Sequence, residues 1–234
     1  GDIWKKSGNR LRWSCIVPAV ALDEALEQVK KAKENGAVAV CLRPLEGNRH
    51  LTDPYFYPLY EAASNLNMAI VVHIANGNPA NVDLYRQPPV NRFAMFRAPT
   101  VIACLNLLLS ELPAVFPRLR WGFIEASAQW IPWIYKEAVI RTKSAGRALS
   151  GDFFGDSNIF VTCQTNDDIP YILRYAGDRC LVIGTDYGHT DISSEMDAIL
   201  EFQKQEGLSL EDKERILFHN PAKLYGLTGS YRQS

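Results

Sequence analysis

The stretch Cys180–His189 reads CLVIGTDYGH, and it carries the pattern that decides the fold. Its first part, Cys180–Thr185, is an apolar run of strand length, and Asp186 with a turn-forming Tyr-Gly pair follows at once. A run that is apolar on both faces is typical of a strand in a sheet covered on both sides. In α/β folds, the residue just after such a strand stands where functional groups gather.

The same unit, a short apolar strand followed by an amphipathic helix, recurs along the chain. The other predicted strands are Arg12–Val17, Ala37–Leu42, Met68–His73, Arg120–Glu125 and Asn158–Cys163. The predicted helices are Leu22–Asn35, Pro54–Leu66, Pro99–Leu112, Ile131–Ser144, Asp167–Ala176, Ser193–Glu206 and Ser209–Leu217. Strands separated by helices predict parallel βαβ units. Six strands fit either a doubly wound sheet or six-eighths of a barrel, but no glycine-rich phosphate loop supports a nucleotide-binding sheet.

Composition limits the class of protein and of partner. The 234 residues are 47% hydrophobic, which suits one domain over residues 1–234 with a large core. A net charge of −1 gives no reason to expect nucleic acid or an anionic membrane as partner. No apolar run is long enough to span a membrane. The five cysteines lack metal-site spacing, so we expect buried, reduced thiols and a cytoplasmic protein.

Three predicted strands end in side chains that can bind a metal ion: His73, Glu125 and Asp186. In a barrel these strand ends meet at one rim, so no local sequence spacing is needed to bring the three together. Each residue also has a structural interpretation. His73 could be a core histidine bonded to a carbonyl, Glu125 a turn cap or arginine partner, and Asp186 a turn former.

Further candidates lie near these strand ends. His189 follows Asp186 closely and could donate a proton, although it could also be an exposed turn histidine. Arg43 directly follows a strand and could bind a substrate carboxylate, or form a surface salt bridge. Trp130 could wall the pocket or simply pack. The long stretch Ile74–Ala98 is predicted to be irregular, as a lid or a dimer arm.

The end of the chain contains one more helix signal. Asn220 and Pro221, after His219, predict the start of a closing helix with Asn220 as its N-cap and Pro221 in its first turn. We interpret this segment as structural.

Four segments resemble the metal-dependent amidohydrolase superfamily, in the branch of aminocarboxymuconate-semialdehyde and γ-resorcylate decarboxylases. They are DPYFYPLYEAASNLNMAIVVH, PRLRWGFIEASAQWIPW, NIFVTCQTNDDIPYILRYAGDRCLVIGTDYGHTD and ILFHNPAKLYGL. The resemblance covers nearly the whole chain and is most specific in the GTDYGH segment. It implies an α/β fold of the (β/α)8 TIM-barrel kind, with strands three to eight present in this chain.

The resemblance also implies the residues of a metal site. His73 falls on the strand-five histidine of the family and Asp186 on the strand-eight aspartate. Glu125 stands where many members have a strand-six histidine, and a carboxylate there is a harder, anionic ligand. The first two strands and their His-x-His pair have no counterpart in this sequence. We therefore expect the natural polypeptide to extend upstream and carry that pair, or another chain to supply it.

The function implied is a metal-dependent hydrolase or a non-oxidative decarboxylase for a small, carboxylated or aromatic substrate. The metal would be Zn²⁺ first, or else Mn²⁺ or Fe²⁺, held by His73, Asp186 and Glu125. Asp186, His189 and Glu125 would be catalytic, and Arg43 and Trp130 would bind substrate. The family often forms homo-oligomers, so we expect one here. The alternative is a barrel without metal that serves as a binding or assembly subunit.

Overall fold

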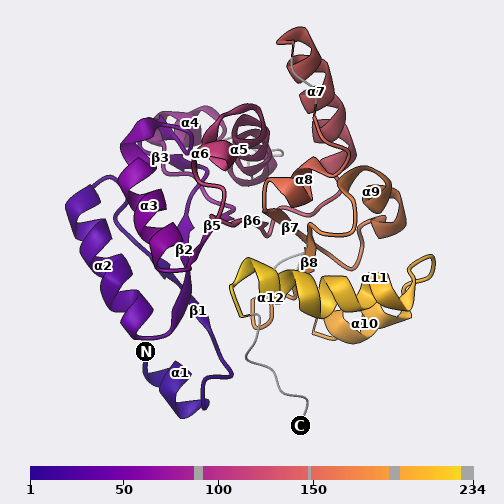
Figure 1. The fold of residues 1–234 in the computed structure, drawn as a ribbon, viewed down its shortest axis with the longest axis horizontal. Coiled ribbons are helices and arrows are strands. Elements are labelled where there is room, and N and C mark those ends of the chain that lie inside the picture. Colours follow the sequence, from indigo (N-terminus) through magenta and orange to yellow (C-terminus); the bar gives the residue numbers. More distant parts are fainter. Residues whose placement is uncertain (87–91, 147–148, 190–195, 228–234) are drawn as a thin grey trace.

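The computed structural model describes residues 1–86, 92–146, 149–189 and 196–227, and its centre is a six-stranded parallel sheet (Figure 1). The strands are β1 (Trp13–Ile16), β2 (Ala37–Leu42), β5 (Ala69–His73), β6 (Trp121–Ile124), β7 (Ile159–Cys163) and β8 (Leu181–Ile183). All six predicted strands are confirmed. Each is hydrogen-bonded to the next one along the chain, in the order β1-β2-β5-β6-β7-β8. A doubly wound sheet reverses its strand order at a switch point, so this unbroken order is that of a barrel.

Helices connect the strands and form an arc around them. In Figure 1 this arc runs from α2 at the left, through α5 in the upper centre, to α9 and α11 at the right. The longer helices are α2 (Leu22–Glu34), α3 (Tyr57–Asn65), α5 (Ala98–Leu109), α7 (Ile131–Ser144), α9 (Ile169–Ala176) and α10 (Ala198–Lys204). Shorter ones are α1 (Asp2–Lys6), η1 (Pro54–Phe56), α4 (Pro79–Leu84), η2 (Phe93–Arg97), α6 (Leu112–Val115), α8 (Phe153–Asp156), α11 (Leu210–Glu214), η3 (Arg215–His219) and α12 (Asn220–Leu224). A small antiparallel hairpin, β3 (Leu45–Glu46) with β4 (Arg49–His50), follows β2. No helix among the described residues is both long and apolar enough to cross a membrane.

The two faces of the sheet are buried in different ways. The outer face packs against the surrounding helices and forms the larger hydrophobic core. The inner face has a smaller cluster, built from strand residues and one leucine of α12: Ala39, Ala69, Val71, Phe160, Val182 and Leu224. Thus α12 covers part of the face that would be the interior of a closed barrel. In the described part of the chain, β1 and β8 each pair with a single strand, so the sheet remains open at both edges.

Two predicted segments differ from the structure: one expected to be irregular contains helices, and one expected helix begins later in the described residues. The stretch Ile74–Ala98 contains the helices α4 and η2. The first of these begins at Pro79 because the preceding Asn78 side chain accepts a hydrogen bond from Asn81 N. Residues 87–91 of this stretch lie outside the described residues. Of the predicted helix Ser193–Glu206, the start at Ser193 lies outside the described residues, and α10 begins at Ala198.

The prediction that Asn220 is an N-cap is wrong. The chain is helical from α11 through η3 into α12, so Asn220 lies inside a continuous helical run. Its side-chain amide donates instead to the carbonyls of Asp178, at 3.0 Å, and Leu181, at 2.8 Å. The cap belongs to Ser209, which forms a capping box with Asp212 at the start of α11. Asn220 therefore attaches the closing helix to β8.

Candidate metal centre and its pocket

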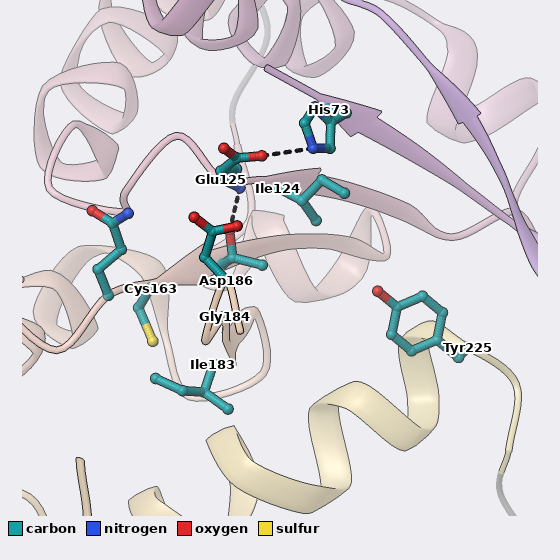
Figure 2. A pocket seen from close by; sticks show the side chains of 10 residues that line it. His73, Ile124, Glu125, Cys163, Ile183, Gly184, Asp186 and Tyr225 are labelled. Carbon is teal, nitrogen blue, oxygen red and sulfur yellow. Dashed lines mark hydrogen bonds and ion pairs between the residues drawn. The ribbon is translucent and has the colours of Figure 1, made fainter. Parts of the chain in front are cut away.

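The structure brings His73, Glu125 and Asp186 together in one pocket at the C-terminal ends of the strands. The pocket has a volume of about 220 Å³. Figure 2 shows the three side chains directed toward one another, from β5, from the end of β6 and from the end of β8. Its other lining residues are Ile124, Thr162, Cys163, Gln164, Ile183, Gly184 and Tyr225.

His73 and Glu125 form the closest contact in the pocket. The His73 Nε2 atom lies 2.6 Å from Glu125 Oε2, and the other ring nitrogen, Nδ1, lies 2.9 Å from the Ile74 carbonyl oxygen. A carbonyl oxygen only accepts hydrogen bonds, so Nδ1 carries a hydrogen and Nε2 is the nitrogen presented to the pocket. An imidazole lone pair and a carboxylate oxygen this close require a cation, either a proton or a metal ion.

Asp186 and His189 form a second pair beside the first. His189 Nδ1 lies 3.0 Å from Asp186 Oδ2, and the His189 amide donates to the Asp186 carbonyl at 3.2 Å. One ligand atom from each of Glu125, Asp186 and His189 lies within 4.8 Å of the other two. Two carboxylates and an imidazole are a donor set that Zn²⁺, Mn²⁺ and Fe²⁺ accept. With His73 Nε2 at Glu125, these residues fit a divalent metal ion.

The backbone after β6 turns sharply so that Glu125 enters the pocket. Glu125 has a φ of 67° and Ser127 a φ of 61°, both in the left-handed region. This region costs a residue with a side chain roughly 1–2 kcal/mol. The Glu125 amide is held by Thr162, whose Oγ1 atom accepts its hydrogen bond at 2.8 Å. Asp186 also has a positive φ, 49°, so both carboxylates stand on turns that direct them inward.

Asp167 joins the loop after β6 to the loop after β7. One carboxylate oxygen accepts hydrogen bonds from the amides of Ala128 and Gln164, both at 2.9 Å, and the other accepts from Ser127 Oγ at 2.5 Å. Asp167 is buried, so these bonds are shielded from water. The two loops that carry Glu125 and Gln164 are thereby held in fixed positions.

Arg43 and Trp130 are not brought to this pocket. The Arg43 guanidinium binds the buried Glu46 carboxylate, with Nε 3.0 Å from Oε2, and this hydrogen bond raises the pKa of Arg43. Gly77 permits the arrangement, because a Cβ atom there would lie 2.4 Å from the Leu45 carbonyl oxygen and 2.8 Å from Arg43 Cζ. Trp130 packs against the outer hydrophobic core. The roles of Arg43 and Trp130 in substrate binding stay predictions.

Sequence reasoning missed Thr162, Gln164 and Tyr225 as residues of the pocket. Thr162 is the one polar residue inside an otherwise apolar strand, and that was a usable signal. Tyr225 gives no such signal, because it lies at the end of a helix whose packing on the inner face follows only from the fold.

Comparisons with known proteins agree with this fold. The model of the amidohydrolase family matches residues 2–227. An amidohydrolase from Mycobacterium avium subsp. paratuberculosis is similar in structure, with a TM-score of 0.77 and 16% identity over 93% of this chain and 58% of that one. The chain thus spans less than two thirds of that protein's length. A comparison with curated proteins found no match.

Two decarboxylases are also similar in structure. The 2,6-dihydroxybenzoate decarboxylase from Rhizobium has a TM-score of 0.77 and 19% identity, over 97% of this chain and 75% of that one. The 5-carboxyvanillate decarboxylase from Novosphingobium aromaticivorans, solved with bound manganese, has a TM-score of 0.76 and 15% identity, over 96% and 68%. These likenesses confirm a TIM-barrel fold with six of its strands in this chain. Because the family model matches nearly all of its residues, the chain belongs to the amidohydrolase family.

Proposed function

We propose that this chain carries the active site of a metal-dependent enzyme that decarboxylates a small aromatic or other carboxylated molecule without an oxidant. Hydrolysis of such a molecule is the second candidate reaction. The observation that supports the proposal is the meeting of His73, Glu125, Asp186 and His189 in one pocket at the strand ends. In barrels of this kind the chemistry takes place at that end.

The metal ion would be held by His73, Glu125 and Asp186, with His189 beside them. It would supply positive charge that polarises a substrate oxygen or lowers the pKa of a bound water. Zn²⁺ and Mn²⁺ both suit nitrogen and carboxylate donors, and the manganese in the Novosphingobium decarboxylase makes Mn²⁺ a metal to test first.

The protein's own groups would orient the substrate and move protons. Asp186 would accept or return a proton at Oδ1 or Oδ2, and His189, 3.0 Å from Oδ2, would stabilise its charged form. The bond from His73 Nδ1 to the Ile74 carbonyl fixes the ring, so that Nε2 keeps facing the pocket. Ile124, Ile183 and Cys163 are apolar residues of the pocket wall, against which the apolar part of a substrate would pack.

The pocket, at about 220 Å³, is smaller than the roughly 300–1,000 Å³ of sites for drug-sized ligands, and so suits a compact substrate for either reaction. Decarboxylation is placed before hydrolysis because of the proteins that are similar in structure. Two of the similar structures are decarboxylases of substituted benzoates. At 15–19% identity these proteins share only the fold with this chain, so they guide the choice of substrates to test.

The test combines metal analysis with a substrate screen. The purified protein would be supplied with Mn²⁺ or Zn²⁺, and release of CO₂ from hydroxybenzoates and carboxyvanillate would be measured beside hydrolysis of aryl esters and amides. We expect a bound metal ion and CO₂ release that Asp186→Asn abolishes, with an unchanged circular dichroism spectrum. Hydrolysis without CO₂ release would favour the second reaction. Absence of a bound metal at saturating concentration would contradict the proposal.

We further propose that the protein is a homo-oligomer. The support is the stretch Ile74–Ala98, which is rich in Arg, Phe and Pro and in which Leu84 and Phe93 are exposed apolar residues. Light scattering at micromolar concentration tests this proposal, and the mass of a monomer would refute it.

A further inference from the structure

Tyr225 is a pocket residue that comes from the opposite direction to the metal-binding groups. It follows α12 directly, whereas His73, Glu125 and Asp186 lie at the strand ends. Figure 2 shows its ring rising from the helix, with the hydroxyl turned toward the side of the pocket where Ile124 and Asp186 lie. The pocket is therefore polar at the strand ends and has a single phenol at the α12 side, with Ile124 and Ile183 among the apolar residues that line it.

The position of Tyr225 is fixed by the anchoring of α12. The Asn220 amide binds two carbonyl oxygens, at Asp178 and Leu181, and Arg120 Nε donates to the Leu224 carbonyl at 2.8 Å. Leu224 is fully buried on the inner face of the sheet. The phenol is thus attached to a helix held at both of its ends, and it is pre-organised for a ligand.

Gly122 of β6 allows this close approach of the helix. A Cβ atom at position 122 would lie 3.2 Å from a methyl carbon of Leu224 and 3.2 Å from one of Val71. A Cβ atom there would be tighter than an ordinary contact, so the Leu224 and Val71 side chains would have to move by a few tenths of an ångström. Gly122 therefore leaves room on β6 for the packing of α12, the helix that Tyr225 follows.

The Tyr225 hydroxyl is available to a ligand. Among the described residues, no side chain or carbonyl forms a hydrogen bond with it. Burial raises the pKa of Tyr225 above its usual value of 10.0, with a smaller contribution from Cys41, so the phenol stays protonated and can donate. A half-buried donor with no partner in the described part of the chain favours a ligand that brings an acceptor to it.

From this geometry we infer that Tyr225 is a specificity-determining residue, which donates a hydrogen bond to an acceptor on the substrate at the α12 side of the pocket. The substrate would then be a small molecule with two polar groups: a carboxylate toward His73, Glu125 and Asp186, and an ether, hydroxyl or carbonyl oxygen toward Tyr225. The inference rests on the proposed function for the site, and it adds a second recognition point.

The test measures binding, without catalysis, by calorimetry in the presence of Mn²⁺. The probes are benzoate, 3-methoxybenzoate and 4-methoxybenzoate, whose methoxy oxygen only accepts hydrogen bonds. We expect one methoxybenzoate to bind about 3- to 10-fold more tightly than benzoate, as one hydrogen bond allows. Tyr225→Phe should abolish this preference and change the affinity for benzoate by less than about 2-fold.

The matched control is Tyr171→Phe, which removes the hydroxyl of a partly exposed tyrosine on α9 that does not line the pocket. It should keep the preference, and the thermal unfolding of both variants should match that of the parent. A preference that persists in Tyr225→Phe, or the absence of any preference in the parent, would overturn the role of Tyr225. If the parent protein binds no metal ion or releases no CO₂, that result counts instead against the proposed function. The two failures are therefore distinguishable.

Discussion

His73 Nε2 and Glu125 Oε2 lie 2.6 Å apart, and they reach this distance because β5 and β6 are neighbours in register, with His73 paired to Ile124. The residue after Ile124 turns into the left-handed region and presents its carboxylate to the imidazole. Removal of one partner leaves the other with its charge or lone pair uncompensated, so the two residues should act as a unit in metal binding.

The first prediction concerns this pair. His73→Ala should lower metal affinity by about 10-fold or more, because it removes a ligand and the group that compensates Glu125. Metal content after dialysis, determined by elemental analysis, measures the effect. His219→Ala is the control, since His219 is an exposed residue of η3 and does not line the pocket. Equal metal content in parent, His73→Ala and Asp186→Ala would show that the metal site lies elsewhere.

A second prediction tests the support of Glu125 by Thr162. Thr162→Val keeps the shape of the side chain but leaves the Glu125 amide without its acceptor, at a cost of about 1–3 kcal/mol. We expect weaker metal binding, by roughly 10-fold, together with lower stability. Thr162→Ser retains the hydroxyl and should bind metal like the parent. If the valine variant binds metal normally, Thr162 has no part in positioning Glu125.

Asp167 provides a third prediction, on stability. Asp167→Ala leaves the amides of Ala128 and Gln164 without their acceptor in a buried place, and should lower the free energy of unfolding by about 2–3 kcal/mol. The neighbouring Asp168→Ala removes only the N-cap of α9, where the carboxylate accepts from Tyr171 N, and should cost about 1 kcal/mol. Urea unfolding compares the two; similar losses would contradict a joining role for Asp167.

The fourth prediction concerns alkaline pH. Burial, with a contribution from the Glu46 carboxylate, raises the pKa of the Cys41 thiol from 9.0 to about 11. In the unfolded chain this thiol loses its proton near pH 9, while the folded protein retains it. The unfolded state therefore binds fewer protons than the folded state in this interval. The contribution of the Cys41 thiol to the free energy of unfolding is fully present below about pH 8 and is lost as the pH rises toward about 11.

Urea unfolding at about pH 7 and about pH 10 measures this loss. The comparison is with Cys41→Ala, which lacks the thiol and should lose less stability between the two values. Groups distant from Cys41 are common to both proteins and cancel in the difference, whereas Cys15 and Tyr225 lose the contribution of Cys41 to their raised pKa values in the variant, in the same direction as the expected result. Equal losses would show that the Cys41 thiol ionises in the folded state as readily as in the unfolded one.

Much of the sheet was predictable from the sequence, because fully apolar runs of strand length mark buried parallel strands. The three strand-end residues His73, Glu125 and Asp186 were found for the same reason, since a strand end is a position that the sequence shows directly. The open choice between barrel and doubly wound sheet was decided by strand order, a property of the folded chain.

Other features depend on contacts that form only in the folded chain. Asn220 has the residue type and the following proline of an N-cap, yet it binds the carbonyls of Asp178 and Leu181, about forty residues earlier in the sequence. Arg43 follows a strand as expected, but a short hairpin turns Glu46, three residues later, back onto it. In neither case does the residue type alone identify the partner.

The left-handed backbone at Glu125 makes stability and chemistry oppose each other at one residue. Asparagine adopts this conformation more readily than glutamate, and its shorter side chain would release the contact with His73. Glu125→Asn should therefore leave the protein as stable as the parent or more so, while it impairs metal binding. If both effects are found, by urea unfolding and by elemental analysis, the strained backbone at Glu125 would be retained for the proposed metal site and not for stability.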